Sequence, residues 1–426
     1  MTNAKPGDRV KVVADKEYEG VLMPNEETDS VVVKLDNGYN VGIEKGKVKE
    51  IKLVKKHEEK ASKKAKHVHK KGLKTVSILH TGGTIASKVD YETGGVISKF
   101  EPEELIDMFP ELDKIVNIKS RLVAQMFSED MMFEHYPTMA KAIAEEIKKG
   151  ADGIILTHGT DTMGYSAAAL AFMLEDLPIP VIIVGAQRSS DRGSSDAGVN
   201  LVCAAQFIAK SDFVGVGVCM HEKMGDNTSV ILPACKTRKL HTSRRDAFKP
   251  VNDSPIAKIN FDSKKIDFLK EDYPKAEKGK KLKLKDKIEE KVALVKVHPN
   301  FKAEQLSAYK GYKGLVIEGT GLGQAPVGPG NEKNLKAIEE LVKNDCIVVM
   351  SSQCIFGRTQ MHVYSNAINL VKAGVIPGQD MLPETAFIKL AWLLGNFSRE
   401  EAKELIGKNL RGEINERLMA EDFLKE

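Results

Sequence analysis

The sequence predicts an α/β protein in which a small β-barrel precedes two α/β domains with parallel sheets. Three observations lead to this prediction. The chain has 426 residues, more than one ordinary core accommodates. Residues 7–54 alternate polar and apolar positions in short runs, whereas the later sequence alternates continuous apolar runs with helix-like segments. Two lysine-rich passages separate these regions.

The composition is that of a globular protein, with 42% hydrophobic and 29% charged residues. A formal net charge of +4 is too small to indicate a nucleic-acid-binding protein by itself. The N-terminus has no apolar signal segment, and the apolar stretch AAALAFML at 167–174 is far shorter than the roughly 18 residues that a membrane span needs. We therefore expect a cytoplasmic protein with no membrane contact.

The five cysteines are an odd number and show no CxxC spacing. Neither a disulfide framework nor a zinc ribbon is indicated, so we expect most of them to be core thiols.

Five short alternating runs fill residues 7–54: DRVKVVA, YEGVLMP, DSVVVKL, YNVGIE and VKEIKLV. The DNG sequence at 36–38 is a tight-hairpin signal, because Asn and Gly accept the positive φ that such turns require. This pattern predicts a small SH3-like β-barrel. Residues 55–74 contain nine lysines and two glutamates and predict a solvated linker, with contact to an RNA backbone as the alternative. We assign residues 1–72 to the barrel and its basic linker.

The first α/β domain is assigned to residues 73–285 and is expected to carry the catalytic residues. Its runs TVSILHT, DGIILTHG and PVIIVGA are continuously apolar, as in a parallel sheet covered on both faces. TMAKAIAEEIKKG predicts a helix with a basic last turn that stops at Gly150. A ligand site is expected at the carboxyl ends of these strands.

The second α/β domain is assigned to residues 286–426. A lysine-rich passage at 277–291, without apolar periodicity, predicts the linker between the domains. Strands are expected at KVALVKVH, GLVIEGTG and CIVVMSSQ, and helices around PETAFIKLAWLLG and SREEAKELIG.

Three expected strand ends carry polar residues in a glycine-rich setting: HTGGTIAS, THGTDTMG and GAQRSSDRGSSDAGVN. Thr84 and Thr160 are candidate nucleophiles, but a threonine hydroxyl is inert at neutral pH unless a base or a polarising neighbour assists it. Asp161 follows Thr160 directly. The glycines among these residues would let a substrate approach the backbone, whose N–H groups could bind an oxyanion. Alternatively, the threonines and glycines only shape turns and cap helices.

TGGTIAS and THGTDTM, followed by GAQRSSDRGSSDAGVNL, resemble the signatures of the bacterial-type asparaginase and glutaminase amidohydrolases. The resemblance extends from Thr75 to the C-terminus and implies two asparaginase-like α/β domains that hydrolyse a side-chain amide. The barrel and the run RKLHTSRRDAFKP at 238–250 further resemble the archaeal-type, tRNA-dependent amidotransferases of this family.

The resemblance also implies roles for individual residues. Thr84 resembles the family's primary nucleophile, and Tyr91 resembles the tyrosine of its mobile flap. Thr160, Asp161 and Lys239 resemble the second catalytic group, in which the lysine and the aspartate polarise a threonine or a water molecule.

Residues 128–130, SED, resemble the segment that holds the α-carboxylate and α-amino groups of the substrate. The expected substrate-binding residues are therefore Gly83, Ser128, Glu129 and Gly159. The family often completes the first catalytic group with an acidic residue from the C-terminal region, and no residue of this sequence is assigned to that role.

The charge around Lys239 leaves two possibilities open. Arg238, Arg244 and Arg245 would favour a neutral, proton-accepting amine, whereas Asp161 would oppose it. The sequence does not decide between them, and a solvated basic surface is the alternative to a catalytic role for the lysine.

Other chemical signals are weaker. His80, His158 and His221 lack the spacing of metal ligands and are interpreted as structural residues, so no metal is expected. EGTGLGQAPVG at 318–328 lacks the Lys-Ser/Thr ending of a phosphate loop and is interpreted as a strand-end loop that closes the crevice. No accompanying motif supports Cys354 as a nucleophile.

The resemblance implies a glutaminase subunit that supplies ammonia to a GatE-like kinase and transferase subunit. This partner would use ATP and Mg to convert Glu-tRNA(Gln) to Gln-tRNA(Gln) and would make most of the tRNA contacts. The sequence shows no nucleotide motif, and we expect no cofactor in this chain. A homodimer core within a hetero-oligomer is expected.

The sequence leaves two alternatives open. One is a free-standing L-asparaginase, because glutamine and asparagine differ by one methylene, which is usually worth only about 1 to 3 kcal/mol in a pocket. The other is a non-enzymatic RNA- or protein-binding module with a degenerate site. The presence of Thr84, Thr160, Asp161 and Lys239 argues against it.

Overall fold

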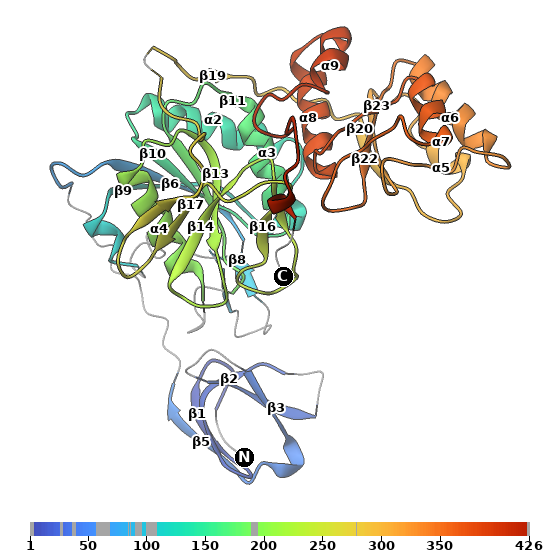
Figure 1. The fold of residues 1–426 in the computed structure, drawn as a ribbon. Coiled ribbons are helices and arrows are strands. Elements are labelled where there is room, and N and C mark those ends of the chain that lie inside the picture. The colour runs from blue at the N-terminus through green and yellow to red at the C-terminus, as the bar shows by residue number, and fades with distance from the viewer. Residues whose placement is uncertain are drawn as a thin grey trace.

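The computed structural model describes residues 4–25, 29–35, 40–56, 69–83, 85, 87–89, 96–98, 109–188, 195–277 and 279–423. Figure 1 shows a small all-β unit at the N-terminus, followed by two α/β units that lie side by side. Among the described residues, every helix is too short or too polar to span a bilayer.

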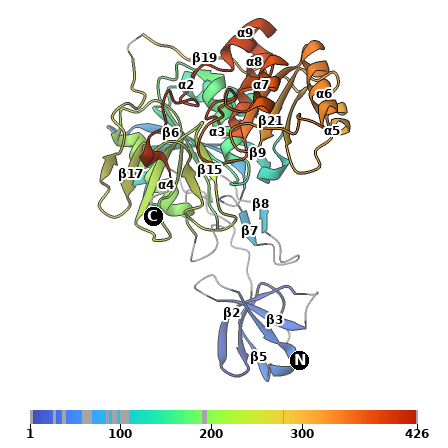
Figure 2. The same cartoon turned by 45° about the vertical axis from the view of Figure 1, so that its right-hand side comes forward.

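The N-terminal unit is a five-stranded antiparallel sheet in the order β4-β3-β2-β1-β5, and it curls into a barrel-like shape (Figures 1 and 2). Its strands are β1 (Arg9–Val13), β2 (Glu17–Met23), β3 (Ser30–Leu35), β4 (Asn40–Glu44) and β5 (Glu50–Lys55), with η1 (Lys45–Lys47) before the last. Alternate residues such as Val10, Val12 and Val33 are fully buried in a core of its own. The predicted barrel-like domain is confirmed, while the DNG turn at 36–38 lies outside the described residues.

An eight-stranded sheet forms the first α/β unit, in the order β18-β17-β14-β13-β12-β10-β6-β9. The strands from β9 to β13 are parallel, and β14, β17 and β18 add an antiparallel edge that the sequence analysis did not predict. The strands are β6 (Thr75–Gly82), β9 (Asn117–Met126), β10 (Gly153–Thr157), β12 (Pro180–Val184), β13 (Gly215–His221), β14 (Thr228–Pro233), β17 (Ala257–Asn260) and β18 (Ile266–Phe268). All residues of β10 and β12 are buried, as their continuous apolar runs predict.

Helices cover both faces of this sheet. They are α2 (His135–Lys148), α3 (Met163–Met173) and α4 (Ala197–Lys210). α2 and α3 share one core with Leu79 of β6, whereas α4 packs on the opposite face against Val76 and Ile78 of the same strand. The predicted stop of α2 is confirmed, because Gly150 follows it with φ +82°.

The second α/β unit contains a four-stranded parallel sheet in the order β20-β21-β22-β23. Its elements are β20 (Val292–Lys296), α5 (Ala303–Ser307), β21 (Gly314–Gly319), α6 (Glu332–Lys343), β22 (Ile347–Ser352), α7 (Ser365–Lys372), β23 (Ile376–Pro377), α8 (Pro383–Asn396) and α9 (Arg399–Leu405). α9 begins with a capping box, in which Ser398 Oγ accepts from the N–H of Glu401 and the Glu401 carboxylate accepts from Ser398.

The remaining strands and 3-10 helices are short. They are β7 (Ser87–Val89), β8 (Val96–Ser98), β11 (Leu174–Glu175), β15 (Thr237–Lys239), β16 (Phe248–Pro250), β19 (Lys283–Leu284), η3 (Leu112–Lys114), η4 (Ser128–Asp130) and η5 (Ala420–Asp422).

The two α/β units share one hydrophobic core across their interface. α8 lies against α3, and the rings of Phe172 and Trp392 stack with their centroids 5.3 Å apart. The lysine-rich passage between the units runs along this interface: the N–H of Lys285 donates to Met173 O, and the Trp392 indole N–H donates to Lys285 O, each at 2.9 Å. The passage is therefore held against the protein by backbone hydrogen bonds.

We expect a chain shortened to begin at His69 to keep the stability of the α/β units, because the barrel has its own core. A chain that begins at Thr75 should be less stable, since Asn117 hydrogen-bonds to the backbone of Lys70 and Leu73. Thermal unfolding of both shortened chains, compared with that of the full chain, tests this. A large loss of stability on removal of residues 1–68 alone would contradict it.

Candidate functional site

Three neighbouring strands of the eight-stranded sheet end at the same edge. β6 lies between β9 and β10 and is parallel to both, so their carboxyl ends come together. The segments that follow them carry Gly83, Ser128 and Gly159, three of the four expected substrate-binding residues. Glu129, the fourth, is exposed in η4 directly after Ser128.

Two glycines allow these three segments to touch. Gly83 has φ +76°, and a Cβ atom at this position would lie 2.3 Å from the Cα of Gly159. A Cβ atom on Gly159 would lie 2.6 Å from the Cβ of Ser128. A side chain at either position would force the backbones apart, and at Gly83 it would also be strained.

Hydrogen bonds fix the loop after β10. The Asp161 N–H donates to Ser128 Oγ at 3.2 Å, and Thr162 Oγ1 donates to Ser128 O at 2.7 Å. Thr160 lies in the sequence between Gly159 and Asp161 and is only 6% exposed. The Gly83 N–H donates to Met126 O at 3.0 Å, so this group is not available to bind an oxyanion, and close packing is the role that the geometry gives to this glycine.

Lys239 reaches the same loop from a separate part of the sequence. It is the last residue of β15, a three-residue strand that pairs with β16 and lies outside the large sheet. Its Nζ is 2.9 Å from Thr160 Oγ1 and 2.7 Å from Asp161 Oδ1. The structure thus brings together the three residues that the resemblance assigns to the second catalytic group.

The arginines around Lys239 each have a carboxylate partner. Arg238 lies 3.5 Å from Glu384, Arg244 lies 2.8 Å from Asp246, and Arg245 pairs with Asp226. The charged group nearest to the Lys239 ammonium is instead Asp161. The ammonium group therefore sits between a carboxylate and a hydroxyl, and its N–H donates to the Thr160 oxygen.

This arrangement supports chemistry at the Thr160 hydroxyl. A donor aimed at the hydroxyl oxygen stabilises the negative charge that develops there when the proton leaves. Asp161 keeps the donor in place from its other side. The same arrangement orients a water molecule equally well, because a water oxygen next to the lysine would feel the same field.

His158 supports the loop from beneath. Its Nδ1 donates to Gly159 O at 2.6 Å, and its Nε2 accepts from Ser166 Oγ at 2.8 Å, which fixes the tautomer of the ring. Burial lowers the pKa of His158 to about 4, so the ring is neutral at pH 7.

His80 and His221, the other two histidines considered in the sequence, also contact polar side chains. His80 contacts Ser120 and Thr157, and burial lowers its pKa to about 4. His221 Nδ1 donates to Asn200 Oδ1 at 2.7 Å. Burial lowers the pKa of His221, although the negative charge of Asp196 acts to raise it. Within the described part of the chain, no group of three metal-ligating side chains is close enough to hold an ion.

Some predicted features fall elsewhere. Thr84 and Tyr91 lie outside the described residues. Of the predicted loop at 318–328, residues 318 and 319 end β21 and the remainder closes on itself, with the Thr320 N–H donating to Gln324 O at 2.9 Å. Four of the five cysteines are buried, as expected of core thiols, and Cys354 is exposed.

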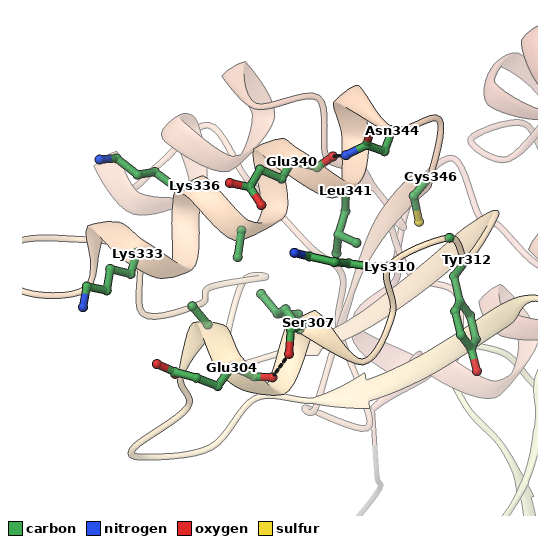
Figure 3. A pocket seen from close by; sticks show the side chains of 14 residues that line it. Glu304, Ser307, Lys310, Tyr312, Lys333, Lys336, Glu340, Leu341, Asn344 and Cys346 are labelled. Carbon is green, nitrogen blue, oxygen red and sulfur yellow. Dashed lines mark hydrogen bonds between the residues drawn. The ribbon is translucent and has the colours of Figure 1, made fainter.

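A groove of about 760 Å³ lies away from the threonine and lysine cluster (Figure 3). It runs between α5 and α6, near the amino ends of β21 and β22, and its lining includes Lys310, Lys336 and Glu340. The cluster around Thr160 is thus not part of this cavity.

Sequence patterns of three known families match the chain. The GatD N-terminal domain matches residues 4–54, the family described as Asparaginase, N-terminal matches residues 75–273, and the Glutaminase/Asparaginase C-terminal domain matches residues 291–406. These matches cover all three structural units.

Two relatives resemble the chain over nearly its whole length. The D subunit of the glutamyl-tRNA(Gln) amidotransferase of Pyrococcus furiosus is 48% identical, over 98% of this chain and 97% of the relative. The protein of the same name from Methanococcus vannielii is 46% identical, over 96% of this chain and 98% of the relative.

Solved structures resemble the two α/β units. The thermostable L-asparaginase from Thermococcus kodakarensis superposes with a TM-score of 0.71 at 28% identity, covering 80% of this chain and all of that chain. L-asparaginase I from Vibrio cholerae gives a TM-score of 0.69 at 28% identity, covering 81% of this chain and all of that chain.

Sequence reasoning missed the residues that support the site. The contact of Gly159 with Ser128 depends on β9, whose run NIKSRLVAQM shows no clean alternation in burial. Ser166 was not predicted, although its spacing of eight residues from His158 across a helix start offered a weak signal. Contacts from the second α/β unit to the turn before β15 could not be inferred from local sequence patterns, because the two partners of each contact are separated by more than a hundred residues.

The buried histidines predict a specific loss of stability in acid. A folded-state pKa of about 4, below the ordinary 6.5, means that the unfolded chain binds the proton more readily. The stabilising contribution is complete above about pH 6.5 and is lost as the pH falls toward 4, by roughly 3 kcal/mol per histidine.

Denaturant unfolding at pH 7 and pH 4.5 measures this effect. The variant His158→Gln should lose less unfolding free energy between these pH values than the wild type, by roughly 2 kcal/mol. His362→Gln, at an exposed position, is the matched control and should behave as the wild type. Equal pH dependence in His158→Gln and the wild type would show that His158 is not the titrating group.

Proposed function

The chain belongs to the family of glutamyl-tRNA(Gln) amidotransferase D subunits, and we infer from this that it is the amide-hydrolysing, glutaminase subunit of such an enzyme. Its reaction is hydrolysis of the side-chain amide of glutamine, which releases ammonia. The observation that carries this function is the contact of the Lys239 ammonium with both Thr160 and Asp161 at the strand ends of an asparaginase-like domain.

We propose the following roles for the residues of the site. The N–H donated by Lys239 stabilises negative charge on the Thr160 oxygen, or on a water molecule beside it, and Asp161 holds the ammonium group. Thr84 acts as the primary nucleophile and Tyr91 assists it, on the strength of the motif that contains them. Ser128 and Glu129 bind the α-amino and α-carboxylate groups of the substrate, with the close packing of Gly83 and Gly159 shaping the pocket.

The barrel supports the amidotransferase over a free-standing asparaginase. The L-asparaginase structures cover about four-fifths of this chain, whereas the amidotransferase D subunits match it almost completely, barrel included. An extra folded domain with its own family pattern suits assembly with other molecules better than hydrolysis of a free amino acid.

We propose that a GatE-like kinase and transferase subunit receives the ammonia. That subunit would use ATP and Mg to activate Glu-tRNA(Gln) and would contact most of the tRNA, while this chain needs no cofactor of its own. A homodimer of this chain would form the core of the hetero-oligomer. Because the final acceptor is a charged tRNA, we place the assembly in the cytoplasm.

We predict that Lys239→Met lowers the rate of glutamine hydrolysis by about a thousandfold, because the hydroxyl loses its polarising donor. Thr160→Val and Asp161→Asn should lower it in the same way. The control is Lys249→Met, on the adjacent strand, whose ammonium donates to Glu222 O and does not contact Thr160. Steady-state ammonia release by the folded variants tests the assignment, and near-normal release by Lys239→Met would refute it.

A second experiment distinguishes the amidotransferase from the asparaginase. The purified chain is assayed with glutamine and with asparagine, first alone and then with the partner subunit and Glu-tRNA(Gln). We expect slow hydrolysis by the chain alone and faster glutamine hydrolysis in the complete mixture, because ammonia released without an acceptor is wasted. Fast asparagine hydrolysis by the chain alone, unchanged by the additions, would favour the free-standing asparaginase.

A further inference from the structure

The position of Lys239 depends on a strand that the large sheet does not hold. β15 has three residues, and its partner β16 is equally short. A lysine side chain has many rotamers, so its ammonium stays between Thr160 and Asp161 only if the backbone that carries it is fixed. The geometry of the catalytic group therefore depends on the residues that anchor β15.

Pairing with β16 and the hydrogen bond from the Val251 N–H to Lys236 O hold this segment within the first unit. The second α/β unit adds three side-chain anchors, two to the turn directly before β15 and one to β15 itself. Thr385 Oγ1 donates to Cys235 O at 2.9 Å, and Lys236 Nζ donates to Asp380 Oδ2 at 2.5 Å. Arg238 lies 3.5 Å from Glu384. All three partners come from the segment 380–385, at the start of α8.

The side chains of residues 236–239, which are the last residue of the turn before β15 and β15 itself, alternate between two surroundings. Lys236 and Arg238 extend to the second unit, whereas Thr237 donates to Pro233 O and Lys239 extends to Thr160. The strand is therefore held on one side by the second unit and presents its catalytic lysine on the other.

The pair of Lys236 and Asp380 is the most constrained of these contacts. Both side chains are 0% exposed. The Asp380 carboxylate also accepts a hydrogen bond from the backbone N–H of Asn415. The backbone carbonyl of Asp380 accepts one from Asn252 Nδ2. A buried ion pair with this many hydrogen bonds has one geometry, and it transmits that geometry to the strand next to it.

We propose that Asp380 is a positioning residue for the glutaminase reaction: through Lys236 it fixes β15 and so holds the Lys239 ammonium against Thr160. The inference rests on the proposed function. It means that the second α/β unit, which contributes none of the residues of the Thr160 cluster, sets the geometry of the catalytic lysine.

The test replaces the buried pair without leaving a lone charge. In Lys236→Met/Asp380→Asn, the asparagine can still accept from Asn415. The matched control is Lys389→Met/Glu413→Gln, which removes a second ion pair with both side chains 0% exposed. The hydrogen bonds of these two side chains go to the backbone of residues 406–411, within the second α/β unit. The kcat and KM for glutamine, the free energy of unfolding and a crystal structure are determined for both.

We expect the Lys236/Asp380 variant to lose at least tenfold in kcat with KM within twofold of the wild type. The control should lose comparable stability and keep its kcat within twofold. In a Lys239→Met background, the Lys236/Asp380 substitutions should change the residual rate by less than twofold, because the residue through which they act is gone. Equal losses in both backgrounds, or no loss of kcat, would overturn the proposal.

Two further measurements keep the proposal testable. If the double variant does not fold, Thr385→Val removes only the hydrogen bond to Cys235 and should lower kcat at least threefold, an effect absent in the Lys239→Met background. The crystal structures test positioning without any assay: Lys239 Nζ should leave Thr160 Oγ1 in the Lys236/Asp380 variant and stay in the control. If the wild type hydrolyses no amide, the proposed function is wrong. If Lys239 keeps its position in the Lys236/Asp380 variant, the positioning role of Asp380 is wrong.

Discussion

The contact between three backbone segments at Gly83, Gly159 and Ser128 is the constraint on which the site depends. Parallel strands bring their carboxyl ends to one edge, but strand spacing alone leaves room for side chains between the loops. Here the absence of a side chain at two positions lets the loops close onto one another. Ser128 can then accept the Asp161 N–H, and the buried hydroxyl of Thr160 acquires a fixed place.

The second constraint is the interface between the two α/β units. Its apolar part is extensive, with Trp392 only 1% exposed against Phe172, and truncation of such a side chain usually costs about 3 to 5 kcal/mol. One buried ion pair, Lys236–Asp380, joins the two units, and the Asp380 carboxylate also accepts the backbone N–H of Asn415. Apolar burial supplies stability here, while the Lys236–Asp380 ion pair restricts the relative placement of the units.

The sequence predicts the elements better than their assembly. The apolar runs of β6, β10 and β12 identify buried parallel strands because both of their faces are covered. The threonine motifs predict a candidate site because their glycines and hydroxyls are local in sequence. The partners of the turn before β15 could not be identified in this way, since Lys236 and Asp380 are 144 residues apart and each alone resembles an ordinary surface charge. The antiparallel edge of the sheet was also missed, because its short strands lack long apolar runs.

The order in which the chain leaves the ribosome gives the last segment a special importance. Lys236 is synthesised long before Asp380, and Lys389 before Glu413. Until residues 380–415 emerge, the face of α3 that receives Trp392 lies open to water and the Lys236 ammonium has no buried carboxylate to meet. The first α/β unit can form its sheet during translation, but the turn before β15 gains its buried partner Asp380 only when the C-terminal segment has been synthesised. Under the positioning role proposed for Asp380, the Thr160 cluster takes its final geometry only after residues 380–415 have been synthesised.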